Sequence, residues 1–383
     1  MYQVKKTDDY ILGDYVLSIT VILQYFLSTL QQCMISVLHM NPESTTVYRI
    51  FLSAIPILFS FYYLLKREAR TVISVYFFTL LIVFFQSVIF PDNFIYINKQ
   101  AFRFLIPVCL PCLLSLFSIR NFYILQKVLR VISWMTFALL LIYVVSYFLN
   151  VFYIDKYNMA FGYGLLLPTL ILYTEKNLIS FCAFLFSVFS ILSFASRGPL
   201  VVVFLYIFYD LYKNNKKYLP MLIGLVFFIL ASLSYIVSYL ETIGIHSRTL
   251  SMIVNGNIDS DSGRERLYDI ILNGIFENPL MGLGIFSDRV LLEGIQPYCH
   301  NFLLELLIDW GIPLSILIIL ILFVLTIKAY LYSNNQEKAV LVMFLLSSLI
   351  PLQVSGSYIN DSSFFSFIGL LLFLQKRRRY QEK

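Results

Sequence analysis

Three side chains, far apart along the chain, have the types needed to act together on an anionic substrate. Arg197 lies in the run SFASRGPLVVVF, Arg264 in SGRERLYDII and His300 in CHNFLLELLIDWGI. An arginine guanidinium presents a planar fork of N–H donors that fits phosphate, and a histidine with an ordinary pKa of about 6.5 suits a general base at neutral pH. Together they would suit a reaction on a diphosphate. The arginines would hold the leaving group, and the histidine would take a proton from an attacking hydroxyl.

Each of the three also has an ordinary explanation when it is taken alone. Arg197 could be an interfacial arginine whose side chain reaches lipid phosphates. Arg264 could lie on a solvated helix of a loop that carries charges of both signs, and a single histidine at a membrane interface is often only an interfacial side chain. We favour the shared role because all three are expected on the same, outer side of the membrane.

Other polar residues nearby are weaker candidates. Arg248 and Arg266 could add substrate contacts, and Asn301 can cap the helix expected after it while lying next to His300. The segment DSD (259–261) has the spacing of a metal-holding DxD, but a flexible acidic turn is favoured because no doubly wound domain accompanies it. The sequence has no Walker loop, GxSxG segment or zinc-ligand spacing, so we expect neither a metal nor another cofactor.

Composition places these residues in a membrane protein. The 383-residue chain is 59% hydrophobic and 13% charged, whereas a soluble domain is about half apolar and about a quarter charged. The runs at 131–150 and 220–240 hold no charged residue, and each is near the ~20 residues that a helix needs to cross the hydrocarbon core. A spanning backbone must satisfy its own hydrogen bonds, and the runs lack the alternation of barrel strands. We therefore expect an all-α integral membrane protein.

Hydropathy predicts about twelve membrane-spanning helices in a single polytopic domain, residues 1–383. The expected spans lie near 13–36, 47–65, 71–90, 102–119, 131–152, 161–173, 178–195, 199–212, 219–240, 312–331, 339–354 and 362–375. With the N-terminus inside, the segments assigned to the cytoplasm hold about 19 of the 28 Lys and Arg residues. This asymmetry predicts that both termini are cytoplasmic, and it accounts for the net charge of +6 without a nucleic-acid partner.

The segment 241–300 is expected to be one long external loop between the ninth and tenth spans. A loop of about 60 residues is uncommon unless it is functional. The segment SGRE (262–265) fits a helix capping box, and apolar residues then recur at helical spacing until Asn278 and Pro279. The glycines of the following MGLGIF suit a tight turn against neighbouring backbone. The loop is therefore predicted to be structured and to carry part of the active site.

The order and spacing of these motifs resemble the signature of the O-antigen ligases and the O-antigen and capsular polysaccharide polymerases. The matching positions are Ser196-Arg197-Gly198, Ser262-Gly263-Arg264 with Leu267-Tyr268, Asn278-Pro279-Leu280 with Gly282 and Gly284, His300-Asn301 with Leu304, and Gly311-Ile312. They cover roughly residues 190–315, whereas the first half of the chain is similar only in being a series of hydrophobic spans.

The resemblance implies a fold like that of membrane-embedded C-type glycosyltransferases and an inverting, metal-independent transfer of a glycan from undecaprenyl diphosphate. Arg197 and Arg264 would bind the diphosphate, and His300 would be the base or would orient the acceptor hydroxyl. Arg248 and Arg266 match no position of the family signature. The resemblance also implies a multi-pass protein of the bacterial inner membrane, with the site on the periplasmic or external side. Its candidate partners are membrane lipids, a chain-length regulator and a flippase.

The signature serves two reactions, and a third function remains open. A polymerase transfers the growing chain onto the sugar of a lipid-linked repeat unit, whereas a ligase transfers the finished chain onto another acceptor such as lipid A-core. The 60-residue loop without large insertions favours the polymerase. Twelve spans with both ends inside would also fit a transporter. That alternative is disfavoured because the polar residues gather on one external loop and no repeated halves are visible.

Overall fold

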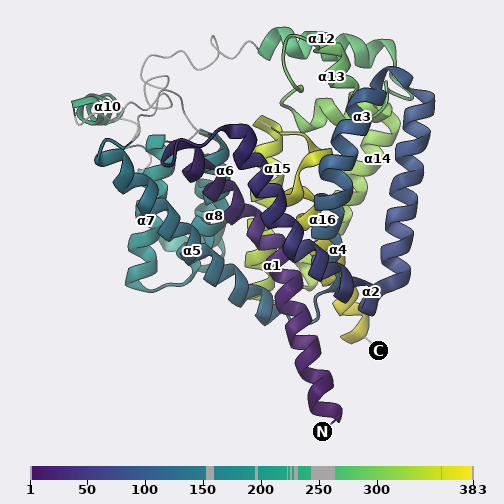
Figure 1. Ribbon diagram of the computed structural model, residues 1–383. Helices are drawn as coiled ribbons and strands as arrows, with labels where there is room; N and C mark the ends of the chain where they lie inside the picture. Colours follow the sequence, from purple (N-terminus) through teal and green to yellow (C-terminus); the bar gives the residue numbers. More distant parts are fainter. Residues whose placement is uncertain are drawn as a thin grey trace. The chain divides into compact units, whose positions relative to one another are not determined.

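The computed structural model describes residues 2–151, 159–194, 197–221, 223–224, 227, 232–242, 264–354 and 356–381. Within these ranges the chain forms helices and no strand, which confirms the all-α prediction (Figure 1). The chain divides into two compact units, each described by itself. The first unit is residues 1–21, 54–125 and 262–383, and the second is residues 22–53 and 126–261.

Three long helices contribute residues to both units: α1 (Tyr2–Ser36), α2 (Pro42–Ile89) and α5 (Phe122–Phe148). The other elements of the first unit are η1 (Pro91–Asn93), α3 (Phe94–Gln100), the π-helix η2 (Ala101–Cys109), α4 (Leu110–Ser118), α12 (Arg264–Glu277), α13 (Ser287–Leu291), α14 (Phe302–Tyr332), α15 (Asn335–Val354), η4 (Tyr358–Asn360) and α16 (Ser362–Gln381). The second unit holds α6 (Met159–Thr174), α7 (Leu178–Phe194), α8 (Arg197–Asn214), η3 (Lys216–Tyr218) and α10 (Leu233–Thr242).

Six helical segments of the described chain are long and apolar enough to cross a membrane. They are Asp9–Ser36, Pro42–Ile89, Pro91–Ser118, Phe122–Phe148, Phe302–Tyr332 and Asn335–Val354, and two shorter apolar helices are Ala160–Thr174 and Leu178–Phe194. These segments agree with a multi-pass membrane protein, whereas the number twelve stays a prediction. α2 includes two of the expected spans, 47–65 and 71–90, and Glu68 between them has non-helical φ and ψ of −142° and 37°. The expected span 219–240 lies partly outside the described residues.

The segment between the second unit and α14 contains a helix, as the apolar spacing predicted. α12 runs from Arg264 to Glu277 and ends directly before Asn278 and Pro279. Its buried face packs in a cluster with residues of the following loop and of α14; the cluster is Leu267, Ile271, Ile275, Leu292, Cys299 and Ile308. This apolar contact fixes the loop helix on the N-terminal end of α14. The expected capping residue Ser262 lies outside the described residues.

In the second unit, α6, α7 and α8 pack against one another. Aromatic rings form much of their core. Tyr143 and Phe161 are stacked with ring centroids 4.2 Å apart, and Phe194 packs edge-on against Tyr143 at 6.1 Å. The last turn of α7 is therefore buried. α8 begins at Arg197, two residues before the start of the expected span 199–212.

Candidate functional site

Two glycine-containing segments of the family signature lie directly against each other in the first unit. The backbone N–H of Leu283 donates to the carbonyl of Ile308 at 2.7 Å, and that of Gly284 donates to the carbonyl of Asp309 at 3.1 Å. Gly311 interrupts α14 with φ of +72° and ψ of 169°. A Cβ atom on Gly311 would lie 2.5 Å from the carbonyl oxygen of Leu280, closer than a real Cβ could approach. Only glycine allows both this backbone conformation and this contact.

His300 lies in the turn that enters α14 and has an uncommon backbone conformation. Its φ is +58°, in the left-handed region that side chains other than glycine rarely adopt. Asn301 follows it and caps α14, because its side-chain oxygen accepts from the N–H groups of Leu303 at 3.0 Å and Leu304 at 3.2 Å. The prediction that Asn301 caps this helix is confirmed. The cap fixes the direction in which the chain leaves His300.

The imidazole of His300 is half-buried, and one of its ring nitrogens lacks a hydrogen-bond partner among the described residues. Its ring centroid is 4.2 Å from that of Tyr298, and its buried Nδ1 has no hydrogen-bond partner within the described chain. Burial, and secondly the positive charge of Arg264, lower the pKa of His300 from 6.5 to about 4. The ring is therefore neutral at pH 7, the state from which a base accepts a proton.

The structure brings Arg264 close enough to His300 for its charge to act on the ring. Arg264 is the first residue of α12, is half-buried, and forms no ion pair with any described residue. It therefore lies at a helix N-terminus, where backbone N–H groups also favour anions. Arg266, two residues on, is exposed on the same helix. Of the predicted site residues, Arg264 and His300 are the pair that the structure places together.

The other predicted site residues are only partly described or not described. Arg197 is the first residue of α8 in the second unit, and its side chain lies outside the described part. Arg248 and the segment 259–261 also lie outside it. Among the described residues, no group of three His, Cys, Asp or Glu side chains could hold a metal ion.

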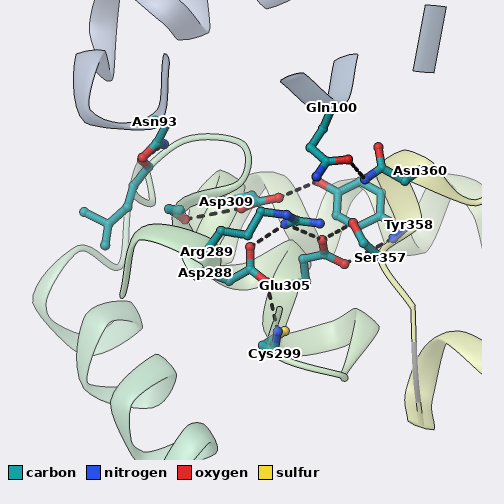
Figure 2. A network of polar contacts seen from close by, with 12 residues as sticks. Asn93, Gln100, Asp288, Arg289, Cys299, Glu305, Asp309, Ser357, Tyr358 and Asn360 are labelled. Atoms are coloured by element: carbon teal, nitrogen blue, oxygen red, sulfur yellow. Dashed lines mark hydrogen bonds and ion pairs between the residues drawn. The ribbon is translucent and has the colours of Figure 1, made fainter. Parts of the chain in front are cut away.

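A buried ion cluster that the sequence analysis did not identify lies beside the His300 turn. Arg289 of α13 places Nη1 2.6 Å from Oδ1 of Asp288 and 3.3 Å from Oε1 of Glu305 (Figure 2). All three side chains are at most 4% exposed. The second oxygen of Asp288 accepts from the backbone N–H of Cys299 at 2.9 Å. The cluster is thus hydrogen-bonded to the residue that precedes His300.

The cluster continues to the segment that precedes α16. Oε2 of Glu305 accepts from the backbone N–H of Tyr358 at 3.1 Å, and the hydroxyl of Ser357 donates to Oε1. The Tyr358 hydroxyl donates to Asp309 at 2.9 Å and accepts from the indole N–H of Trp310 at 2.7 Å. These contacts join the loop, α14 and the start of η4. Buried charges are stable only when they are paired or hydrogen-bonded, and this cluster meets that condition.

One part of the cluster was visible in the sequence. Glu305 and Asp309 are four residues apart in an otherwise apolar helix, which places two carboxylates on one face and requires partners for them. The partner, Arg289, lies in the run SDRV, which matches no motif. It precedes Glu305 by 16 residues in the chain, and its side chain contacts Glu305 in the fold. Hydropathy and spacing give no rule for such a pairing.

Comparison with known proteins identifies one family. Residues 182–319 match the family model described as O-Antigen ligase, whereas no curated protein and no solved structure matches the chain. The matched residues include Arg197, Arg264 and His300, and also Arg289 and Glu305 of the buried cluster. The match supports the resemblance found in the motifs. Residues 182–319 therefore form a domain that is similar to the O-antigen ligase family.

Proposed function

We propose that the chain is a polysaccharide polymerase that transfers a glycan from undecaprenyl diphosphate to the non-reducing sugar of a lipid-linked repeat unit. Members of its family are glycosyltransferase-like enzymes of the membrane, and the family implies a lipid-linked glycan as substrate. The observation that carries the proposal is the pairing, inside the matched domain, of a neutral histidine with an arginine at a helix N-terminus. Among the described residues, Nδ1 of that histidine has no hydrogen-bond partner and the arginine forms no ion pair.

In the proposed reaction, the acceptor hydroxyl gives its proton to His300 and its oxygen attacks the anomeric carbon of the donor sugar. The bond from that carbon to the diphosphate oxygen breaks, and the diphosphate leaves with the electron pair. Attack from the opposite face inverts the anomeric configuration. Arg264, together with Arg197, offsets the charge that develops on the leaving oxygen. Bound diphosphate would also offset the effect of Arg264 on His300, so substrate binding would strengthen the base.

The proposal includes a place and a topology for the enzyme. The chain would cross the bacterial inner membrane about twelve times with both termini in the cytoplasm, and the loop 241–300 would face the external side. Arg248, Arg266 and Asn301 would contribute further substrate contacts. Membrane lipids would surround the helices, and a chain-length regulator and a flippase would work with the enzyme.

A ligase is the second candidate, and one observation favours it: the matching family model is itself described as O-Antigen ligase. A ligase would use the same arginines and histidine on the same donor, but would transfer the finished chain to lipid A-core or another acceptor. The polymerase is preferred because the chain is compact and the loop of about 60 residues carries no large insertion.

Purified protein in proteoliposomes, supplied with an undecaprenyl-diphosphate-linked repeat unit, tests the proposal. Products would be separated on a gel, with and without added lipid A-core, for the wild type and for His300→Ala and Arg264→Lys. Matched controls are His39→Ala and Arg70→Lys, because both side chains are exposed and neither is assigned to the site.

Each outcome of this assay has a defined meaning. A ladder made from the repeat unit alone, lost in both test variants and kept in both controls, supports the polymerase. A single transfer that requires lipid A-core supports the ligase. An absence of transfer under both conditions contradicts both enzymes and returns the transporter to consideration.

A further inference from the structure

A cavity of about 330 Å³ opens between α3 and the loop that leads to His300. It is lined by Tyr96 of α3, by Arg289 and by the segment 293–297. The side chain of Asn93, directly before α3, donates to the carbonyl of Leu283 at 2.8 Å and joins the start of α3 to the segment that precedes α13 (Figure 2). We propose that this cavity binds the sugar of the acceptor as a neutral carbohydrate, an inference that rests on the proposed transferase function.

The lining side chains match the two kinds of surface that a sugar ring presents. The ring has an apolar face of C–H groups, and Tyr96, Ile295 and Pro297 offer apolar surface to it. Its hydroxyls both donate and accept hydrogen bonds. The carboxylate of Glu293 can only accept, and the amide of Gln296 can do both. The volume lies near the lower end of the range of roughly 300–1,000 Å³ for ligand pockets, which suits one or two sugar units and excludes a polyprenyl chain.

The electrostatics of the cavity favour a neutral ligand over an anion. Arg289 is the one cation among the lining residues, and its charge is already met by Asp288 at 2.6 Å and Glu305 at 3.3 Å. Both ion pairs use Nη1, so other N–H groups of the guanidinium can donate to hydroxyls. Glu293 adds a further negative charge to the wall. A diphosphate or a uronic acid would therefore meet an excess of carboxylates in this cavity.

The same loop connects the cavity to the proposed base. The lining segment ends at Pro297, and the next residue, Tyr298, contacts the ring of His300 at 4.2 Å between centroids. Asp288, which holds Arg289 in the cavity wall, also accepts from the N–H of Cys299. A sugar in the cavity would therefore lie beside the turn that carries His300. The diphosphate would be bound by the arginines at another point.

A binding experiment that needs no transfer tests this assignment. The probe is the free repeat-unit oligosaccharide of the source organism, without lipid or diphosphate, added to the full-length protein in nanodiscs and followed by saturation-transfer NMR. We expect the dissociation constant to rise about tenfold in Glu293→Ala and in Gln296→Ala, since each substitution removes hydrogen bonds to the ligand. Glu277→Ala, an exposed carboxylate at the end of α12, is the matched control.

A second ligand tests the charge argument directly. The same oligosaccharide, after oxidation of one primary hydroxyl to a carboxylate, should bind at least tenfold more weakly to the wild type, and Glu293→Gln should recover part of that loss. Equal binding of the two ligands would overturn the assignment of a neutral ligand.

The outcomes separate this inference from the proposed function. Absence of binding by the wild type, or equal binding by the wild type, Glu293→Ala and Gln296→Ala, overturns the cavity assignment even if transfer is fully active. Binding that depends on Glu293, in a protein that shows no transfer in proteoliposomes, supports the cavity while overturning the proposed reaction.

Discussion

Replacing Arg289 by methionine would test whether the buried cluster holds the loop in place. The substitution keeps a side chain of similar length and removes the cation that Asp288 and Glu305 both contact. At an effective dielectric constant of about 20, separations of 2.6 and 3.3 Å correspond to roughly 6 and 5 kcal/mol of attraction before desolvation is subtracted. Removing one partner of a buried ion pair generally costs about 3–5 kcal/mol, because the remaining charges stay buried without compensation.

The expected result is a large loss of thermal stability. A cost of at least about 3 kcal/mol, at roughly 2 °C per kcal/mol or more, predicts a melting temperature about 6 °C lower for Arg289→Met. The assay is thermal unfolding of detergent-purified protein, followed by tryptophan fluorescence because Trp310 donates to Tyr358 within the cluster. Arg70→Met removes an exposed arginine of the same unit and should change the free energy of unfolding by no more than about 0.5 kcal/mol.

A double substitution identifies the cause of that loss. In Arg289→Met the carboxylates of Asp288 and Glu305 face each other without a cation. Asp288→Asn should then relieve part of their repulsion, so the double variant should melt above Arg289→Met alone. The reasoning would be refuted if Arg289→Met melted like the wild type, or if the two substitutions lowered the melting temperature additively.

Three further predictions concern the His300 turn and the elements that fix it. Because the pKa of His300 is lowered to about 4, the unfolded chain binds a proton that the folded chain does not once the pH falls below 6.5. Stability should therefore decline between pH 6.5 and 4 more steeply in the wild type than in His300→Asn, as measured by urea unfolding at each pH. Gly311→Ala should destabilise the protein by at least about 1–3 kcal/mol, because the residue has a φ of +72° and the added Cβ would lie 2.5 Å from the carbonyl oxygen of Leu280. Gly224→Ala should be neutral or slightly stabilising, because no described atom lies within 4 Å of the added Cβ. Thermal unfolding of the two variants compares these effects. Asn301→Ala should cost about 1 kcal/mol through loss of the α14 cap, and Asn301→Asp, which retains the acceptor oxygen, should recover most of it in the same assay.

Patterns that repeat locally along the chain predicted the fold well. The apolar residues of α12 recur at helical spacing, and the helix ends at Glu277, directly before the asparagine and proline that were expected to stop it. Asn301 caps α14 as its type and position indicated. Such features depend on residues three or four apart, so a sequence contains them directly. The number of membrane spans is harder to predict from sequence, because a charged segment does not always separate two helices. α2 continues through the charged segment at Glu68 with a single non-helical residue.

The pairing of distant side chains could not be predicted in the same way. Arg264 and His300 were grouped by chemical type and by resemblance, and in the structure the charge of Arg264 contributes to lowering the pKa of His300. Arg289 was missed because nothing in its own neighbourhood indicates that it is buried. Its environment is set by Glu305, which only the turn between α13 and α14 brings within 3.3 Å. A buried carboxylate can be recognised from spacing, but its partner depends on the path of the chain between them.

The cluster also explains why a strained turn can be maintained at this site. His300 holds a φ of +58°, a conformation that costs roughly 1–3 kcal/mol and persists only when surrounding contacts determine it. Those contacts are present on both sides: Asp288 holds the N–H of Cys299 before it, and Asn301 is locked to the first turn of α14 after it. The strain is therefore offset by hydrogen bonds of its neighbours, and within the described part of the chain Nδ1 of the imidazole has no hydrogen-bond partner. On the proposed function, this arrangement fixes the position of the turn that carries the base.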